Sequence, residues 1–570
     1  MQPRSHPPLS APRLAREALL VGLGWLLVAL ARSPGLTLHL GSRLQGHPDT
    51  DTPTVPWTLW HVAHSIATQG DLGVHTQLIG FPDGGSFWPM TPVEAVLLTP
   101  ITLLAGPVLA ANLLLPLHVA LAGALLYALL RSLTGSWPAA LAATPILALS
   151  PVLLCSAHNG NPEVSQLFWL PLVGLATTQT VARGGAWRTA LGGALLALAA
   201  VSNTYVGLAA VVVAGALGLA AGPRHWRRLA GLLGVAALLA APCLLFALQV
   251  STADAALLQR SGEEILRQRL VEGQADLLGF VLPGAVRALG PDLLPTAFLN
   301  GWSTGLAALV LASLGLFTAR SRLGWWALGL ALVGALLALG PWLALDHGAR
   351  LTGQAHIPLP YLLLDRLPPF NKLIELWRFA MVTHLAAAIL AGLWLAQRSR
   401  PITLAAGALL LAEAMLLNPG PAAWRSTTPP DPELSQLVQG LEPGPVLHLP
   451  VRQGHWPLYF QTIHHQPVGI TMANSMEEEI FAHMAGPSWS MESVAAMAKA
   501  KGYRWIILHH RPAMQALQPV VAIAQDLEAA GMVTRRAGDL TLVDVTRDCC
   551  WPSARYISID LPSRAPGSDP

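Results

Sequence analysis

The sequence predicts a mostly α-helical, polytopic membrane protein with about eleven transmembrane helices and a small C-terminal extracytoplasmic α/β domain. Three observations predict this class. Of the 570 residues, 53% are hydrophobic and only 11% are charged, whereas about 25% charge is usual in soluble domains. Apolar runs long enough to cross a bilayer recur up to residue 417. Arginines occupy every second connection between these runs.

The predicted spans are apolar runs of about 16 to 24 residues. They begin near Glu17, Val108, Trp137, Val164, Ala186, Tyr205, Leu229, Trp302, Leu323, Phe379 and Ile402. Positive residues concentrate in cytoplasmic connections, and the side shared with Arg13 and Arg16 also holds Arg131, Arg183, Arg188, Arg224, Arg227, Arg228, Arg320, Arg322, Arg398 and Arg400. This alternation predicts a multi-pass protein of the cell (inner) membrane, with a cytoplasmic N-terminus and everything after Asn418 outside.

The predicted transmembrane domain, residues 1–417, has longer outer connections at 33–92, 150–163, 249–301 and 344–376. A short apolar stretch from Val93 to Leu104 predicts a half helix. A stretch rich in Gln, Glu and Arg, from Asp254 to Leu278, predicts a solvated amphipathic helix. Functional chemistry is expected in the outer connections because they are the longer and more polar ones.

A Pro-rich linker, residues 418–432, leads to a predicted α/β domain at 433–570. Its pattern predicts strands at Val446–Leu449, Trp505–His509 and Leu540–Val545, and helices near Met491–Lys501 and Val520–Ala530. The sequence of this domain shows no phosphate-cradling glycine loop and no metal-spaced Cys/His set. We expect the domain to cover an active site or to dock an acceptor.

Asp49 and Asp51 follow the first predicted span, two residues apart at the expected membrane surface. Carboxylates in such a place can act as a general base or hold a divalent cation through oxygen ligands. The alternative is that they cap the helix that follows.

That helix carries Trp57, Trp60, His61 and His64 on the face opposite to Val55, Leu59, Val62 and Ile66. The spacing predicts a helix lying on the membrane surface. Its aromatic face is interpreted either as a sugar-stacking wall or as an interfacial anchor, because tryptophan favours the headgroup region of a bilayer.

The second outer connection contains His158 and Glu163 in a compact polar turn between two apolar runs. If this turn approaches the first loop, the two residues can orient an acceptor hydroxyl or complete a Mg²⁺ or Mn²⁺ site with Asp49 and Asp51. The alternative is a turn whose polar side chains cap the next helix.

The fourth outer connection and the mouth of the span that follows it hold three cations, Arg366, Lys372 and Arg378, on the side where positive charge is normally scarce. An anionic group is the expected partner. Otherwise Arg378 pairs with Glu375 and Lys372 reaches lipid headgroups.

Several short motifs occur in a characteristic order. After the acids and tryptophans come Phe81-Pro82-Asp83-Gly84, Asn112, Leu133-Thr134-Gly135, Ser150-Pro151 with His158, Leu170-Pro171-Leu172, Ser202-Asn203-Thr204-Tyr205, Pro360-Tyr361, Arg378-Phe379 and Gly502-Tyr503-Arg504-Trp505. In this order the chain resembles a bacterial branch of the GT-C class of polytopic glycosyltransferases. The resemblance covers most of the chain, although in this sequence Thr50 separates two acids that are usually adjacent.

The resemblance implies a GT-C-like fold and an inverting transfer of a sugar from a polyprenyl-phosphate donor to an acceptor glycan, lipid or protein outside the membrane. It implies that Asp49 or Asp51 is the base and that Arg378, Lys372 and Arg366 bind the donor phosphate. It adds Tyr361 to the substrate-binding candidates Trp57, Trp60, His61, His64, His158 and Glu163.

The competing interpretation is a non-enzymatic membrane protein, such as a lipid-linked saccharide transporter or an envelope assembly factor. Transport pathways usually need ionisable groups within the bilayer, and here Glu413 is the exception to a pattern of charge at the interfaces. Nucleic acid is not an expected partner, because the net charge is only +3 and the 34 lysines and arginines are dispersed.

Overall fold

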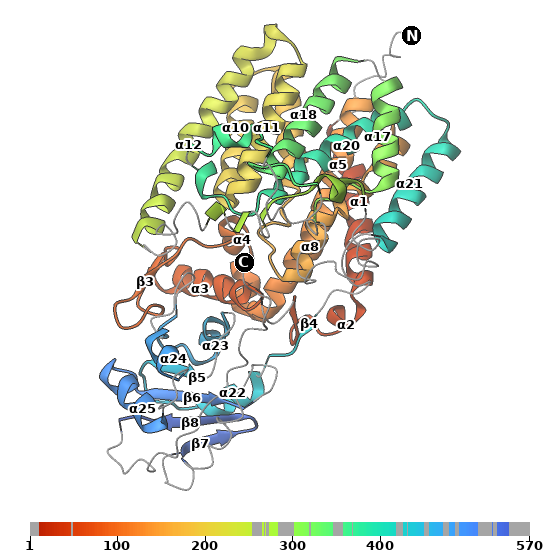
Figure 1. The fold of residues 1–570 in the computed structure, drawn as a ribbon. Coiled ribbons are helices and arrows are strands. Elements are labelled where there is room, and N and C mark those ends of the chain that lie inside the picture. The colour runs from red at the N-terminus through yellow and green to blue at the C-terminus, as the bar shows by residue number, and fades with distance from the viewer. Residues whose placement is uncertain are drawn as a thin grey trace.

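The computed structural model describes residues 11–46, 50–253, 265–266, 268–269, 273–282, 301–318, 321–345, 357–367, 369–417, 426–429, 431–449, 455–470, 478–484, 490–510, 527 and 533–546. The described chain forms a helical domain and, at one end of it, a smaller domain built on a four-stranded sheet (Figure 1). The predicted class, helical and polytopic with a small C-terminal α/β domain, is confirmed.

A helix or a run of short helices lies at each predicted span. The helices are α1 (Ala11–Arg32), α5 (Pro107–Thr134), α6 (Trp137–Ala143), α7 (Pro145–Ala148), α8 (Pro151–Asn159), α9 (Trp169–Arg183), α10 (Ala186–Ser202), α11 (Thr204–Ala220), α12 (Trp226–Ala253), α17 (Leu306–Thr318), α18 (Arg322–Leu339), α20 (Ala380–Leu395) and α21 (Arg400–Leu416). Within the described residues, 6 segments are both long and apolar enough to cross a membrane, and several shorter helices are also apolar. The chain is thus a multi-pass membrane protein.

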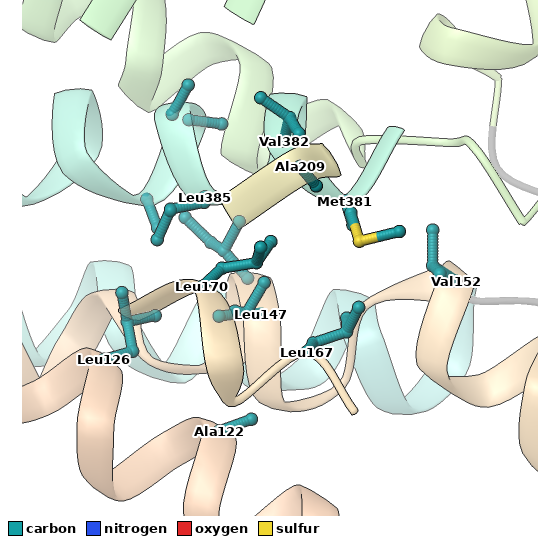
Figure 2. Close-up of a cluster of buried hydrophobic side chains, with 14 of the residues drawn as sticks. Ala122, Leu126, Leu147, Val152, Leu167, Leu170, Ala209, Met381, Val382 and Leu385 are labelled. Atoms are coloured by element: carbon teal, nitrogen blue, oxygen red, sulfur yellow. The ribbon is translucent and has the colours of Figure 1, made fainter. Parts of the chain in front are cut away.

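Burial divides these helices into an inner and an outer set. In the apolar stretch of the segment that contains α20, 94% of the residues are buried, whereas only 17% are buried in that of α1. Ala122, Leu126, Leu147, Val152, Leu167, Leu170, Ala209, Met381, Val382 and Leu385 pack together in the interior (Figure 2). Leu19, Leu27, Leu238 and Phe317 on the outer helices are exposed, which suits a surface whose solvent is lipid.

The loop after α1 builds a platform at one end of the helical domain. It contains α2 (Pro34–Thr37), α3 (Thr54–Thr68) and a small hairpin of β2 (His75–Thr76) with β3 (Gly85–Ser86). The predicted half helix is α4 (Pro92–Ala105), which packs against α3 and α5. Asn112 of α5 holds the loop in place, because its amide donates to the carbonyls of Leu40 and Arg43.

The C-terminal domain has the strand order β5-β6-β8-β7. Strands β5 (Val446–Leu449) and β6 (Trp505–His509) are parallel, and β8 (Leu540–Asp544) is antiparallel to β6 and to β7 (Val533–Ala537). The helices are α22 (Asp431–Val438), α23 (Trp456–His464), α24 (Glu478–Met484) and α25 (Met491–Ala500). The three predicted strands and the helix near Met491 are confirmed, whereas the helix predicted at Val520–Ala530 falls almost entirely outside the described residues.

The C-terminal domain docks onto the first loop, where α23 contacts α3 (Figure 1). Strand β1 (Leu44–Gln45) pairs with β4 (Ser426–Thr427) of the linker, and the ring of Phe81 lies 5.2 Å from that of Tyr503. The chain before the second span and the chain after the last span therefore lie at the same end of the helices. This placement is expected if the chain crosses the membrane an even number of times between these two segments, as the arginine pattern predicts.

The prediction of a solvated helix at Asp254–Leu278 is wrong for the described part of that segment. Arg269, Gln274 and Asp276 are buried, and Asp276 caps the short helix α15 (Leu277–Val281). Glu413 also has a structural role, because its carboxylate accepts hydrogen bonds from the backbone N–H groups of Leu306 and Ala307 at the start of α17.

Candidate active site

Asp51 lies in the turn before α3, at the boundary between the helical domain and the C-terminal domain. Its Oδ1 is 3.5 Å from Nδ1 of His455, and its side chain is 42% exposed. The hydrogen bond from His455, together with the charges of His455 and Arg378 and a hydrogen bond from Asn161, holds the pKa of Asp51 below its ordinary value. The carboxylate does not cap α3, which begins without a side-chain cap. Asp51 is therefore an ionised group that is open to a ligand.

The loop between α8 and α9 brings Asn161 and Glu163 to Asp51. Glu163 is buried, and its burial raises the pKa of its carboxyl to about 7, with a further upward effect from the charge of Asp51 and an opposing one from Arg378. Its Oε2 has no hydrogen-bond partner among the described residues. The capping alternative does not hold for Glu163, since α9 begins at Trp169 without a side-chain cap.

Arg378 reaches the same place from the segment that follows α19, within the short helix η4 (Leu376–Phe379). Its guanidinium pairs with Glu375 and lies over the ring of Tyr205, 5.0 Å from the centroid. The hydroxyl of Tyr205 accepts hydrogen bonds from the N–H groups of Ile374 and Glu375, each at 3.0 Å. Although the Glu375 pair forms, the buried Nε of Arg378 has no partner in the described part of the chain.

Arg269 fixes the loop that carries Arg378. Its guanidinium donates to the carbonyls of Leu373 and Phe370 at 2.6 and 2.9 Å, and to the carboxylate of Asp365 at 2.7 Å. It is almost fully buried, with 1% exposure. Arg269 thus anchors both sides of a turn, which holds Arg378 toward Asp51 and Glu163.

The other candidates from this loop lie differently. Arg366 and Lys372 are exposed on its surface, whereas Arg378 is buried beside the two carboxylates. Tyr361, at the start of α19 (Tyr361–Leu364), is buried, and its hydroxyl donates to the carbonyl of Phe370 at 2.9 Å. The position of Tyr361 is that of a residue that supports the loop.

Around Trp57 the aromatic face of α3 is covered by protein. Trp57 is fully buried, its indole donates to Oε1 of Gln461 at 2.8 Å, and its ring packs against Phe87 and His61. The interpretation of Trp57 as part of a sugar-stacking wall or as a lipid anchor is therefore wrong, because the C-terminal domain occupies that face. Trp60 and His64 are partly exposed and stack on each other with a 5.4 Å centroid separation.

The predicted cation site is only partly described. Asp49 and the side chain of His158 lie outside the described residues, so the structure places only Asp51 and Glu163 of the four predicted ligands. Within the described side chains no group of three His, Cys, Asp or Glu residues has the geometry to hold a metal ion. The counter-charge beside the two carboxylates is the guanidinium of Arg378.

Sequence patterns missed His455 and Arg269. His455 precedes α23 in a domain without a recognisable catalytic motif, and its partner Asp51 is about 400 residues away in the chain. Arg269 lies in a stretch whose composition is typical of a solvated helix. Neither residue has a local signal, because only the tertiary fold brings it to its partners.

No family model matches the sequence, and no characterised protein matches it by sequence. In structure the chain is similar to a mutant of the arabinofuranosyltransferase AftD from Mycobacteria, with a TM-score of 0.54 and 16% identity over 94% of this chain and 42% of that one. The chain thus spans less than half the length of AftD. This likeness shows that the chain shares the fold of that arabinofuranosyltransferase.

Two weaker structural similarities also cover most of the chain. The oligosaccharyltransferase AglB from Archaeoglobus fulgidus has a TM-score of 0.46 and 13% identity over 90% of this chain and 72% of that one. ArnT from Cupriavidus metallidurans, bound to undecaprenyl phosphate, has a TM-score of 0.42 and 14% identity over 95% of this chain and 100% of that one.

Proposed function

We propose that the protein is a membrane glycosyltransferase that moves a sugar from a polyprenyl-phosphate donor to an acceptor hydroxyl at the outer membrane face. The observation that carries the proposal is the convergence of Asp51, Glu163 and Arg378 from three separate loops. A carboxylate that can take a proton then lies beside a buried cation that can hold a leaving phosphate. The GT-C fold supports this assignment.

In the proposed reaction the acceptor oxygen attacks the anomeric carbon of the donor sugar. The bond between that carbon and the phosphate oxygen breaks, and the hydroxyl proton passes to Asp51. The lipid phosphate leaves with the bonding electron pair. A single displacement inverts the configuration at the anomeric carbon. Because the lipid phosphate is a good leaving group, the enzyme needs a base and a positive charge more than it needs a strong acid.

The roles follow from the two electrostatic environments. Asp51 stays ionised at neutral pH because its pKa is lowered by His455 and Arg378, so it is ready to accept the proton. Arg378 keeps a buried Nε–H without a partner in the described residues, and a phosphate oxygen would satisfy it. Glu163, with a pKa of about 7, is protonated in part of the molecules and can then donate a hydrogen bond to the donor or the acceptor.

Lys372 and Arg366 lie exposed on the same loop as Arg378. We assign them to the approach of the anionic headgroup, where exposed charges act over a distance of about a Debye length, and not to the buried phosphate contact. A Mg²⁺ or Mn²⁺ ion held by Asp51 and Glu163 would be an alternative to Arg378 for neutralising the phosphate charge. It would require ligands beyond the described side chains, for which Asp49 and His158 are the candidates.

The outer location of the site is part of the proposal. It places Asp51, Glu163, Arg378 and the C-terminal domain on the extracytoplasmic face, and the N-terminus in the cytoplasm, as the arginine alternation predicts. A cytoplasm-specific reporter fused after Pro570 should be inactive, and one fused at Pro223 should be active. The reverse pair of results would overturn this orientation.

The activity is tested by transfer from a radiolabelled polyprenyl-phosphate sugar to endogenous acceptors in membranes that contain the wild type or Asp51→Asn. Loss of a positioned base should lower the rate about 10²- to 10⁴-fold. Asp71→Asn is the matched control: Asp71 is exposed in the same loop and accepts a hydrogen bond from the N–H of Gly73, which an asparagine oxygen also accepts. Absence of transfer by the wild type, with retained lipid binding, would instead favour the non-enzymatic alternative.

A further inference from the structure

A cavity lies on the far part of α3, away from Asp51. It has a volume of about 570 Å³ and lies between the C-terminal half of α3 and the β2–β3 hairpin. This volume falls within the range of about 300–1,000 Å³ that is usual for small-molecule sites. Because α3 rises 1.5 Å per residue, the cavity begins on the order of 15 Å from the turn that holds Asp51.

The lining of this cavity is unusually polar. The side chains come from His61, His64, Ser65, Gln69, His75, Thr76, Gln77, Leu78, Asp83 and Ser86, together with Gly84 and Gly85. Leucine 78 is the one aliphatic side chain in this set, whereas most small-molecule sites are lined mainly by apolar groups. A hydrocarbon chain would leave these polar groups without partners, so a lipid tail is a poor occupant.

The charges of the lining residues restrict the chemical class of the ligand further. Among the described lining residues there is a carboxylate, Asp83, and no arginine or lysine, which disfavours a phosphate. No three of the described His, Cys, Asp and Glu side chains form a metal-binding group. Amides, hydroxyls and imidazoles supply both donors and acceptors, and this mixture matches the hydroxyl groups of a neutral saccharide.

At the wall of the cavity one buried ring nitrogen has no hydrogen-bond partner among the described residues. His61 is 1% exposed, and its Nε2 lies 2.9 Å from the carbonyl oxygen of Gly73. Its Nδ1 has no partner among the described residues, although a buried polar atom of this kind normally has one. Burial also holds the pKa of His61 below its ordinary value, so the imidazole is neutral and offers one donor and one acceptor.

An aromatic stack adjoins the cavity. His64 lines it, and the rings of Trp60, His64 and His465 form a cluster in which Trp60 stacks on His64 and on His465, with centroid separations of 5.4 and 5.2 Å. His465 has a positive φ of 57° because it ends α23 as a left-handed cap, and its backbone N–H donates to the carbonyl of Gln461. The C-terminal domain therefore contributes an aromatic ring to the wall beside the cavity.

We propose that this cavity binds a neutral oligosaccharide, as a subsite for a sugar chain whose end is the acceptor at Asp51. The inference rests on the proposed function for the identity of the acceptor, but the binding itself does not require catalysis. The distance along α3 means that only a chain of several sugars reaches both places. The cavity would then select long acceptors over single sugars.

The test measures binding of linear hexasaccharides of arabinofuranose, mannose and glucose to the full-length protein in nanodiscs, without donor, by titration calorimetry. We expect at least one of them to bind. Gln69→Ala with Gln77→Ala removes two exposed side chains of the cavity, and should weaken that binding roughly 10- to 100-fold, at about one hydrogen bond per residue. Gln436→Ala, an exposed glutamine of α22, should leave it unchanged.

The failures of the two proposals can be told apart. Any one of three results would overturn the subsite proposal. These are no binding of any hexasaccharide at millimolar concentration, equal binding by the double variant and the wild type, and displacement of the sugar by inorganic phosphate. Saccharide binding that depends on Gln69 and Gln77 in a protein that shows no transfer would support the subsite and count against the glycosyltransferase activity.

Discussion

The indole N–H of Trp57 donates a hydrogen bond to Oε1 of Gln461 across 2.8 Å. This bond joins α3 of the first loop to α23 of the C-terminal domain, and both partners are buried. The same Gln461 amide donates to the carbonyls of Leu78 and Gln466. A single glutamine therefore joins the helix, the hairpin loop and the C-terminal domain.

Trp57→Phe keeps most of the packing but leaves Oε1 of Gln461 buried without its donor. A buried unsatisfied group of this kind costs about 1–3 kcal/mol, so the thermal unfolding temperature of the solubilised protein should fall. Gln461→Leu removes all three hydrogen bonds and should cost more. Trp137→Phe, at a tryptophan that is 42% exposed, should have a small effect. Equal unfolding temperatures for Trp57→Phe and Trp137→Phe would contradict the docking described here.

Glu163 should make the stability of the protein fall as the pH rises. Its pKa is raised from 4.5 to about 7 by burial, so the folded protein retains a proton that the unfolded chain releases. This contribution is complete below pH about 4.5, is lost as the pH rises through about 7, and amounts to roughly 3 kcal/mol. Glu163→Gln should therefore unfold at a higher temperature than the wild type at pH 8 and show little difference at pH 5. Parallel pH profiles would contradict the assignment.

A buried histidine cluster predicts the opposite pH response for the C-terminal domain. Nδ1 and Nε2 of His448 lie 3.0 and 3.2 Å from ring nitrogens of His509 and His464. Burial lowers the pKa of His448 well below its ordinary value and that of His464 to about 3. Stability from these neutral rings is complete above pH about 6.5 and is lost on acidification, by roughly 2 kcal/mol per histidine at pH 5.

Hydrogen exchange of the full-length protein measures this effect. The amides of β5, β6 and α23 should lose protection between pH 7.5 and pH 5, after correction for the intrinsic exchange rate, while the amides of α20 keep theirs. If the protection of β5 and β6 were independent of pH, the account of the cluster would be wrong.

Chelation should leave transfer intact, because the guanidinium of Arg378 already lies beside Asp51 and Glu163 as a counter-charge. The measurement is the transfer rate after dialysis against EDTA, with and without added Mn²⁺ or Mg²⁺. A loss of activity that either ion restores would place a cation at the carboxylates, and would make Asp49 and His158 its next ligands to test.

Much of the architecture could be predicted because it depends on local composition. The apolar runs gave the helices, and the short alternating segments gave β5, β6 and β8. The paired acids, and the cations predicted on the same side of the membrane, also pointed to Asp51 and Arg378, because a charge at a membrane surface is conspicuous against an apolar background. The resemblance pointed to Asn112 and Tyr205, which the structure shows as a loop anchor and as the ring beneath Arg378.

The features that the sequence did not predict depend on contacts between distant segments of the chain. Periodicity placed Trp57 on the aromatic face of α3, but it could not show whether the partner of that side chain is lipid, sugar or another domain. In the structure the C-terminal domain covers Trp57. Arg269 sits in a stretch with the composition of a solvated helix, yet it binds carbonyls about 100 residues away. A pattern read along the chain cannot detect a partner that only the tertiary fold supplies.

The most direct test separates the two proposed roles by measuring donor affinity and turnover for Asp51→Asn and Arg378→Gln in nanodiscs. Asp51→Asn should bind a polyprenyl-phosphate sugar as the wild type does and turn over about 10²- to 10⁴-fold more slowly. Arg378→Gln should bind the donor more weakly, while Arg398→Gln, on the predicted opposite face, should change neither quantity. Wild-type turnover by Asp51→Asn together with wild-type donor affinity in Arg378→Gln would contradict the account.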